Sequence, residues 1–310
     1  MSEKVSISIV IPLYNKETSI EKTIQTVLSQ SFVNFEVIVV NDGSTDNGLE
    51  VLKSIKDRRI KIINKDNGGV SSARNRGILE ANADYIAFLD ADDYWDPDYL
   101  EEMHKLILDF PNASIYGCAY DWVGNGVSKT DDFHFPPLYR GIVNNYFQTA
   151  LNHHLFWTSA VIVKKKSIQE VGCFDERMSI GEDLDVWFRM NLNYHGVFFN
   201  KVLAHYNING PNRAMKRKHD YRKSIMFYFD DYKNDEYKSA DFSAFINKFK
   251  AYKIFDLLNN FELSRKEIKE YISKINKKKI TPKMRFLLSL PHFLIILLIT
   301  KIIKINYNHL

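Results

Sequence analysis

The sequence of 310 residues is poor in cysteine, and its two cysteines, Cys118 and Cys173, lie far apart. This spacing excludes a cysteine-rich zinc module and argues against a disulfide scaffold, so we expect two reduced thiols in the core. The patterns G-x-G-x-x-G and G-x-x-x-x-G-K-[ST] are also missing. The chain therefore lacks the glycine-rich loops with which dinucleotide-binding folds and P-loop proteins hold phosphates.

A strong charge of one sign is absent as well, because 42 Lys and Arg stand against 38 Asp and Glu, a net charge of +4. Local clusters of charge therefore matter more than the total. The apolar run at the N-terminus is too short for a signal peptide and has no small-residue cleavage site, so we expect a cytoplasmic protein. There is no internal repeat and no low-complexity linker.

The first hundred residues do contain an alternation of two hydrophobic periods. Strand-like runs occupy 5–15, 35–44, 59–64 and 84–90, and helical patterns occupy 17–30, 45–56 and 71–82. Strands that alternate with helices of this length predict a parallel sheet with right-handed crossovers. Such sheets bind ligands beyond the carboxyl ends of their strands, and we expect the functional site at that edge.

Past residue 100 the alternation loosens. We expect further strands at 114–123, 156–165 and 196–208, helices at 97–109 and 182–193, and only helices from about residue 215. The sequence thus predicts an α/β domain over residues 1–212 and a helical C-terminal region over 213–310.

Five carboxylates crowd residues 90–98, directly after an apolar strand and with no lysine or arginine among them. Closely spaced aspartates suit Mg²⁺ or Mn²⁺, which bind through few carboxylates together with substrate phosphates. Asp90 and Asp92 flank Ala91 and lie on one side of an extended chain, which makes them candidates for a cation site. Asp96 and Asp98 are better explained by an acidic loop, with Asp96 as a helix N-cap.

The peptides IPLYN and NDGSTD follow the first two strands. Pro12 ends a buried strand, and the aromatic and amide side chains of Tyr14 and Asn15 could form a shelf for a planar base. Asp42 could accept a hydrogen bond from a base N–H or a ribose hydroxyl. The alternative for NDGSTD is a plain connection from strand to helix.

Two further groups of residues carry candidate chemistry. Glu182 and Asp183 open a helix, where acids stabilise the helix dipole by about 0.3–1 kcal/mol, but this explains one acid better than two. A carboxylate at this position could instead act as a general base. His205, near Asn209, could be a further metal ligand or touch a diphosphate, or it could be a half-buried histidine paired with backbone.

The adjacent pair His153 and His154 points to opposite sides on any regular element. We expect these two residues to have structural or acceptor-loop roles.

Five motifs taken together resemble family 2 glycosyltransferases of GT-A fold. They are SIVIPLYN, VVNDGSTD, NGGVSSARNRG, IAFLDADD and GEDLDVWFR, and the resemblance covers about residues 5–210. It implies a Rossmann-like, mostly parallel sheet flanked by helices, a sugar-nucleotide donor, a divalent metal and inversion at the anomeric carbon. The Q-x-x-R-W signature of the processive members is absent, which argues for one sugar added per encounter.

The resemblance also implies roles for single residues. Pro12 and Tyr14 would border the base, with Asn15 beside them; Asp42 would contact the base, Arg74 and Asn75 would line the nucleotide pocket, and Asp90, next to Ala91, would face the ribose or the metal. Asp92 would ligate the metal, and His205 is a second, weaker candidate for a metal ligand. Asp183 would be the catalytic base, and Glu182 would lie near the acceptor. Family members usually carry Asp where Asn41 stands, which leaves the contact of Asn41 open.

Basic residues concentrate late in the chain. Residues 264–285 hold nine Lys and Arg against two Glu, and the apolar run 286–299 follows. This run is shorter than the ~20 residues of a spanning helix and contains Pro291. A basic segment before an apolar helix suits an anionic membrane surface at the cytoplasmic face. The alternatives are docking on the catalytic domain or in a homodimer. No nucleic-acid motif is present, so we expect no nucleic-acid partner.

Three functions compete for this sequence. The first is an inverting hexosyl- or N-acetylhexosaminyltransferase, using a UDP-sugar by family frequency and a saccharide or lipid-linked saccharide acceptor in cell-surface polysaccharide synthesis. The second is a non-catalytic sugar-nucleotide-binding module, against which the intact Asp92, Glu182 and Asp183 argue. The third, a sugar-1-phosphate nucleotidyltransferase, would need a Gly-rich, basic N-terminal loop that is missing.

Overall fold

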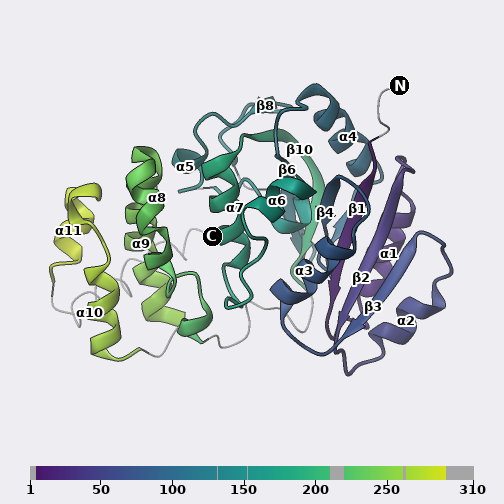
Figure 1. Cartoon of the computed structure of the whole chain (residues 1–310), viewed down its shortest axis with the longest axis horizontal. Helices are drawn as coiled ribbons and strands as arrows, with labels where there is room; N and C mark the ends of the chain where they lie inside the picture. Colours follow the sequence, from purple (N-terminus) through teal and green to yellow (C-terminus); the bar gives the residue numbers. More distant parts are fainter. Residues whose placement is uncertain (1–4, 131, 152, 210–219, 261–262, 291–310) are drawn as a thin grey trace. The chain divides into compact units, whose positions relative to one another are not determined.

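The computed structural model describes residues 5–130, 132–151, 153–209, 220–260 and 263–290 (Figure 1). The chain divides into two compact units, Met1–Arg217 and Lys218–Leu310, and each is described by itself. Residues 210–219, where the boundary between them falls, lie outside the described residues. The predicted boundary after residue 212 therefore stays a prediction.

The first half of the first unit alternates strands and helices as predicted. Its elements are β1 (Ile7–Leu13), α1 (Ile20–Leu28), β2 (Phe35–Asp42), α2 (Gly48–Ser54), β3 (Ile60–Lys65), α3 (Val70–Glu80) and β4 (Tyr85–Phe88). The four strands are parallel in the order β3-β2-β1-β4. β1 and β2 are buried almost throughout, as expected for strands covered on both faces.

The helix α3 approaches the sheet closely at one glycine. A Cβ atom on Gly77 would lie 2.2 Å from Cγ1 of Val10 in β1. Two carbon atoms cannot approach so closely, so the position suits glycine, which has no Cβ atom. This contact seats α3 on the sheet and brings Arg74 to the ends of the strands, so it matters for the site described below.

The second half of the unit extends the same sheet. Its elements are β5 (Tyr94–Trp95), α4 (Tyr99–Asp109), β6 (Ile115–Gly124), β7 (Val127–Thr130), β8 (Arg140–Ile142), α5 (Tyr146–Thr149), the 3-10 turn η1 (Thr158–Ala160), β9 (Val161–Lys164), α6 (Lys165–Glu170), α7 (Glu182–Asn193) and β10 (Gly196–Asn207). The order continues β4-β9-β6-β10-β5, with β7 paired to β6 and β8 to β10.

Strand direction decides where the ends of these strands lie. β9 is antiparallel to both β4 and β6, and β6 is parallel to β10. The strands β1, β2, β3, β4, β6 and β10 therefore all run the same way, and their carboxyl ends share one edge. The sheet is mostly parallel, as predicted, and short strands such as β9 and β5 run antiparallel to their neighbours.

The second unit is helical, as predicted, with no strand among residues 220–260 and 263–290. Its elements are η3 (Tyr221–Lys223), η4 (Phe229–Tyr232), α8 (Lys233–Lys238), α9 (Ala240–Asn260), α10 (Arg265–Ser273), η5 (Lys277–Lys279) and α11 (Pro282–Leu287). Lys250 is 2% exposed, and its ammonium group pairs with Glu236 at 2.8 Å. Ser264 and Glu267 form a capping box at the start of α10.

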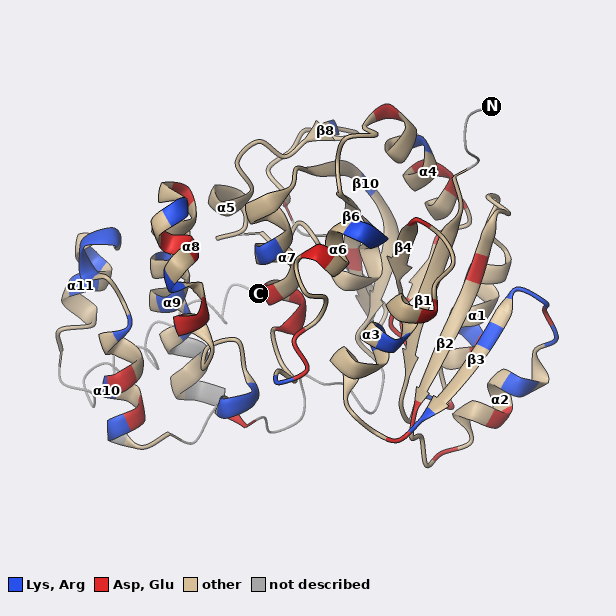
Figure 2. Ribbon diagram, viewed as in Figure 1, with Lys and Arg blue, Asp and Glu red and all other residues tan. Residues whose placement is uncertain are grey.

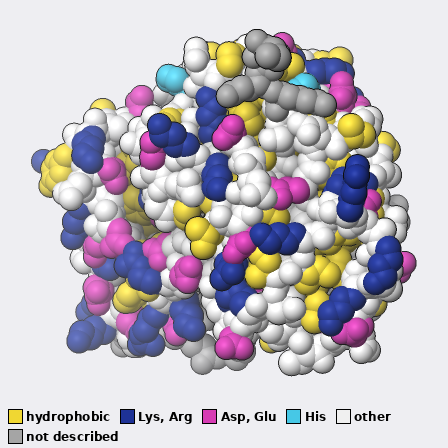
Figure 3. Space-filling model, turned by 45° about the vertical axis from the view of Figure 1, so that its right-hand side comes forward, with side chains coloured by type: hydrophobic (Ala, Val, Ile, Leu, Met, Phe, Trp, Pro, Cys, Tyr) yellow, Lys and Arg dark blue, Asp and Glu magenta, His cyan; other side chains and the backbone are white. Residues whose placement is uncertain are grey.

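Lysine and arginine are frequent along α8 to α11 (Figure 2). On the face of the molecule in Figure 3, basic and acidic side chains are interspersed, in keeping with the small net charge. Within the described residues, no helix combines the length and the apolar character needed to cross a membrane. Most of the apolar run 286–299, which we expect at a membrane surface, lies outside the described residues.

Candidate functional site

The two aspartates predicted to form a cation site have basic partners from elsewhere in the chain. Asp90 accepts a hydrogen bond from Nη2 of Arg74 in α3 at 2.8 Å. Asp92 pairs through Oδ2 with the ammonium group of Lys16, which follows β1. The positive charge that is missing from residues 90–98 is thus supplied by tertiary structure.

Asp93 is the most deeply buried carboxylate of this loop, at 1% exposure. The hydroxyl of Ser159 in η1 donates to its Oδ2 at 2.7 Å, and the backbone N–H of Asn207 in β10 donates to its Oδ1 at 3.1 Å. Burial, reinforced by the charges of Asp92 and Asp90, raises the pKa of Asp93 well above its usual value. The loop after β4 is therefore anchored to two neighbouring elements, η1 and β10.

A buried guanidinium joins this loop to the start of α7. Arg74 is 3% exposed, and its Nη1 donates to Oε1 of Glu182 at 2.9 Å while Nη2 holds Asp90. Burial alone would lower the pKa of Arg74, but Asp90 and Glu182 outweigh it and raise the pKa. The Nε–H of Arg74 has no hydrogen-bond partner among the described residues. A buried donor of this kind is costly unless a ligand or water accepts from it.

Asp183 lies beside this ion-pair network, in the first turn of α7. Burial raises the pKa of the Asp183 carboxyl group, and the charge of Asp90 adds to the effect, although Arg74 opposes it. Burial and the neighbouring Asp183 likewise raise the pKa of Glu182. A raised pKa brings a carboxylate closer to the basicity that general-base catalysis needs.

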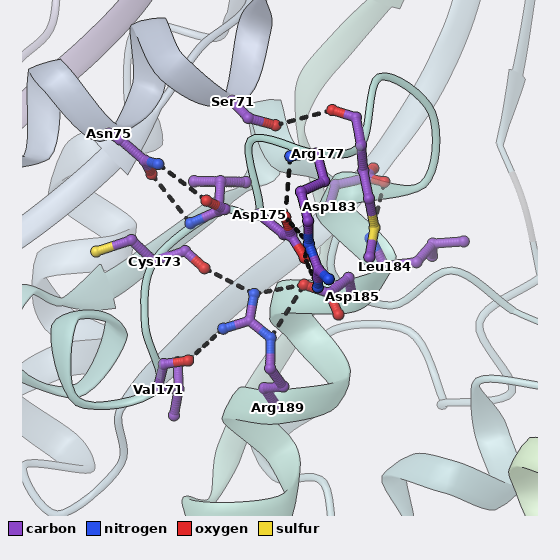
Figure 4. Close-up of polar contacts among 12 residues, drawn as sticks. Ser71, Asn75, Val171, Cys173, Asp175, Arg177, Asp183, Leu184, Asp185 and Arg189 are labelled. Atoms are coloured by element: carbon purple, nitrogen blue, oxygen red, sulfur yellow. Dashed lines mark hydrogen bonds and ion pairs between the residues drawn. The ribbon is translucent and has the colours of Figure 1, made fainter. Parts of the chain in front are cut away.

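The loop that leads into α7 is held by hydrogen bonds from both sides (Figure 4). Asn75 in α3 accepts from the backbone N–H of Phe174 at 3.0 Å and donates to its carbonyl at 2.9 Å. Arg189 in α7 donates to the carbonyls of Val171 and Cys173 and pairs with Asp185. Gly181 then takes φ +77°, and α7 begins at Glu182. The side chain of Asn75 thus binds this loop; that it also lines a nucleotide pocket stays a prediction.

The residues predicted around a nucleotide base meet at the ends of β1 and β2. Asn15 takes φ +52°, and its Oδ1 accepts from the backbone N–H of Thr45 at 2.8 Å. Tyr14 and Pro12 are partly exposed beside it. Asn41 donates to Oδ1 of Asn64 at 3.0 Å, so this amide joins β2 to β3.

Asp42 ends β2 and is nearly surrounded by donors. Its Oδ1 accepts from Lys65 at 2.6 Å and from the N–H of Gly68 at 2.9 Å, and its Oδ2 accepts from the N–H of Gly69 at 2.8 Å. A carboxylate has about four acceptor positions, which leaves one for a ligand.

His205 lies in β10 between two carboxylates. Its Nδ1 is 2.6 Å from Oδ1 of Asp121, its Nε2 is 3.0 Å from Oδ1 of Asp96, and its ring stacks on Tyr94. Both ring nitrogens are therefore hydrogen-bonded, whereas a metal ligand needs one of them with a free lone pair. The helix α4 has Asp98 as its N-cap, so the prediction that Asp96 caps this helix is wrong.

No group of three or more His, Cys, Asp and Glu side chains in the described part of the chain has a metal-binding arrangement. That Asp92 ligates a divalent cation stays a prediction. Its carboxylate already pairs with the ammonium group of Lys16, and Mg²⁺ is often held by one or two carboxylates together with substrate phosphates.

Several residues near the carboxylates of the loop after β4 could not be identified from the sequence. Lys16 and Ser159 gave no motif signal of their own. Trp122, Trp157 and Tyr206 form a partly exposed aromatic cluster, with ring centroids 4.7 Å apart for Trp122–Tyr206 and 5.1 Å apart for Trp157–Tyr206.

The remaining histidines and the asparagine singled out in the sequence make contacts with nearby residues. His153 contacts the ring of His134, the carbonyl of His154 accepts from Tyr120, and Oδ1 of Asn209 accepts from the N–H of Asn125. Both cysteines are free; Cys118 is buried and Cys173 is partly exposed.

Similar proteins provide an independent comparison. The family model described as Glycosyl transferase family 2 matches residues 8–172. Chondroitin synthase of Pasteurella multocida (strain Pm70) is 28% identical over 283 residues, which are 86% of this chain and 28% of that protein. Glycosyltransferase GlyA of Streptococcus pneumoniae is 38% identical over 118 residues, 37% of this chain and 17% of that protein. The chain spans less than a third of the length of these two curated relatives.

Among solved structures, residues 1–349 of S. aureus TarS in complex with UDP-GlcNAc match with a TM-score of 0.73. The match covers 92% of this chain and 86% of that chain at 17% sequence identity. At this identity the likeness shows the fold alone, and it confirms the predicted α/β fold of GT-A type.

Proposed function

Because the chain belongs to glycosyl transferase family 2, we propose that it transfers a sugar from a nucleotide-sugar to a hydroxyl of a saccharide or lipid-linked saccharide. The observation that carries the proposal is the convergence of Asp90, Glu182 and Asp183 on the buried guanidinium of Arg74, at the carboxyl ends of the strands. Ligands of open α/β sheets bind at this edge.

The nucleotide of the donor lies, in this proposal, beside Tyr14 and Asn15, with its base against Asp42. The free acceptor position of Asp42 supports this placement, since a base N–H would complete the set of donors around a carboxylate that is 3% exposed. A UDP-sugar is the proposed donor because TarS, which shares the fold, is found in complex with UDP-GlcNAc.

Asp183 is the proposed base. It takes the proton from the acceptor hydroxyl as the oxygen attacks the anomeric carbon, and the bond to the nucleoside diphosphate breaks on the opposite face. A positioned base typically contributes roughly 10²–10⁴-fold to the rate. Glu182, which precedes Asp183 in the chain, accepts a hydrogen bond from Arg74 and so fixes the position of the arginine.

A divalent cation, Mg²⁺ or Mn²⁺, is part of the proposal, with Asp92 as its ligand from the protein. When bound, the cation supplies positive charge that stabilises the departing diphosphate. The grouping of Asp90, Asp92 and Asp93 on one loop supports a cation there, because a divalent ion would offset the repulsion among closely spaced carboxylates.

The aromatic cluster of Trp122, Trp157 and Tyr206 is the proposed contact surface for a saccharide acceptor. It lies near the carboxylates, because Ser159 and Asn207, which follow Trp157 and Tyr206 closely in sequence, both hydrogen-bond Asp93. Binding sites for small molecules combine aromatic walls with a few polar groups in this way.

We also propose that the protein acts at the cytoplasmic face of the membrane in polysaccharide synthesis. The basic residues of 264–285, among them Lys277–Lys279, support contact with anionic lipid headgroups.

The test combines binding and turnover. A screen of UDP-sugars by thermal shift, with and without Mn²⁺, should give a stabilisation that needs both, because ligands that bind only the folded state raise the melting temperature. Transfer to a saccharide should then be lost in Asp183→Asn while donor binding is kept, with Asp84→Asn, at an exposed position, as the matched control. Donor binding without hydrolysis or transfer to any acceptor would instead favour a non-catalytic sugar-nucleotide-binding module.

A further inference from the structure

The cation next to Asp92 is a lysine of the chain itself. The ammonium group of Lys16 pairs with Oδ2 of Asp92, and the two side chains are only 18% and 14% exposed. Asp92 is also the residue that we propose as the metal ligand. The positive charge of Lys16 repels a divalent cation that approaches the same carboxylate, so the two cations compete for Asp92.

The backbone around Lys16 is fixed relative to Asp92, which makes the pair a built feature of the site. The carbonyl of Lys16 accepts from the N–H groups of Ser19 and Ile20 at the start of α1. The hydroxyl of Ser19 donates to the carbonyl of Ala91 at 2.9 Å. The loop after β1 is thereby bonded directly to the loop that contains Asp92.

The side chain of Lys16 remains adaptable although its backbone is anchored. Lysine is a point charge on a flexible four-carbon stem, and it is a common partner of phosphate groups. It follows Tyr14 and Asn15 directly, so it starts from the loop where we propose that the nucleotide binds. A diphosphate bound near Asp92 would offer the ammonium group a second anionic partner within reach of that stem.

We propose that Lys16 is an internal counterion that occupies Asp92 until a divalent cation displaces it, and that it then moves to the diphosphate of the donor. This inference rests on the proposed function. It has two thermodynamic consequences. Metal alone binds more weakly than it would to an unpaired Asp92, and metal and nucleotide bind cooperatively because the nucleotide provides the displaced lysine with a new partner.

A purely structural ion pair would behave differently. Its loss would lower the melting temperature but would leave the affinity for metal unchanged or weaken it. The binding of metal in the absence of nucleotide therefore separates the two roles.

The experiment measures Mn²⁺ binding by electron paramagnetic resonance, first without and then with UDP, for the wild type and for Lys16→Met. Methionine keeps most of the length of the side chain and removes its charge. The matched control is Lys22→Met, which removes an exposed lysine of α1 whose ammonium group lies over the ring of Tyr94 and is not paired with Asp92. Lys16→Arg, which keeps the charge, shows whether charge or shape matters if the methionine variant is poorly folded.

Without UDP, we expect Lys16→Met to bind Mn²⁺ more tightly than the wild type by roughly 5-fold or more. The increase in Mn²⁺ affinity that UDP causes should be smaller in this variant by a similar factor. Typical coupling between two sites is about 5–150-fold. Lys22→Met and Lys16→Arg should stay near the wild type.

Equal Mn²⁺ affinity in the wild type and in Lys16→Met would overturn the inference and leave the proposed function standing, and so would an equal change in Lys22→Met. If no variant bound Mn²⁺ even with UDP present, the metal part of the proposed function would fail and the inference would fail with it.

Discussion

Arg74 donates from Nη1 to Oε1 of Glu182 at 2.9 Å, across 108 residues of sequence. The same guanidinium holds Asp90 through Nη2. One side chain of α3 therefore joins the acidic loop after β4 to the first turn of α7, the two parts that the proposed transfer reaction would use together.

The first prediction concerns the stability that this arginine provides. Arg74→Met should destabilise the protein by about 3–5 kcal/mol, because it leaves the buried Glu182 and the partly exposed Asp90 without their cation. Arg74→Lys should cost less, since a charge remains although it cannot bridge Asp90 and Glu182 at once. Urea unfolding measures both. Equal losses in the two variants would mean that the shape and hydrogen bonds of the guanidinium, rather than its charge alone, explain the role of Arg74.

The second prediction concerns pH. The pKa of Asp183 is raised, and a base works only when ionised, so activity is full above this pKa and falls as the pH drops through it. The acidic limb of the kcat/KM profile should therefore lie above the ordinary aspartate pKa of about 3.9. Asp183→Asn should lower the rate by roughly 10²–10⁴-fold and remove the limb. A limb at or below the ordinary value would argue against Asp183 as the base.

The third prediction separates two roles of Asn75. Asn75→Ala removes two hydrogen bonds to the backbone of Phe174, so it should destabilise the protein by about 1–3 kcal/mol and lower kcat by misplacing the start of α7. The affinity for UDP should stay unchanged when measured by calorimetry. If UDP affinity fell as much as kcat, Asn75 would be a nucleotide contact, as the family resemblance implies.

The fourth prediction tests the close packing of α3 on β1. Gly77→Ala should destabilise the protein by about 1–3 kcal/mol, because the new methyl group would collide with Val10. The double variant with Val10→Ala should lose less than the sum of the two single losses, since the second change makes room for the first. Thermal unfolding of the four proteins measures this cycle. Additive losses would show that the two positions do not interact.

The fifth prediction addresses the acceptor. Trp157→Ala should raise the KM for a saccharide acceptor by roughly 2- to 12-fold, which corresponds to the 0.5–1.5 kcal/mol that aromatic contacts contribute beyond buried area. The affinity for UDP should not change. Trp157→Phe keeps an aromatic ring, so its KM for the acceptor should stay close to that of the wild type. Initial rates at varied acceptor concentration provide the measurement. An unchanged KM in the alanine variant would place the acceptor elsewhere.

Local patterns were enough to predict much of the fold. The apolar runs of β1 and β2, the helical periodicity of α1 and the turn peptides after each strand are properties of neighbouring residues, so they can be read in order along the chain. They also placed Asp42 and Asp90 at the carboxyl ends of strands. The wrong prediction that Asp96 caps α4 also came from local patterns, because the start of a helix can shift by one or two residues.

Contacts between distant segments could not be predicted in this way. Lys16 and Asp92 are 76 residues apart, and His205 meets Asp121 and Asp96 across 84 and 109 residues. The direction of β9 depends on which strands pair with it, which no pattern within Val161–Lys164 specifies. Asn75 likewise faces the Phe174 loop because of how α3 packs on the sheet.

The order of strands and helices, and the placing of acids at strand ends and at a helix start, were determined by the sequence itself, because hydrophobic period and turn chemistry act over a few residues. Which cation meets each of those acids was decided only by the tertiary structure. Charge interactions act through space, and the fold alone sets the distances that decide whether Arg74, Lys16 or a neighbouring carboxylate lies closest.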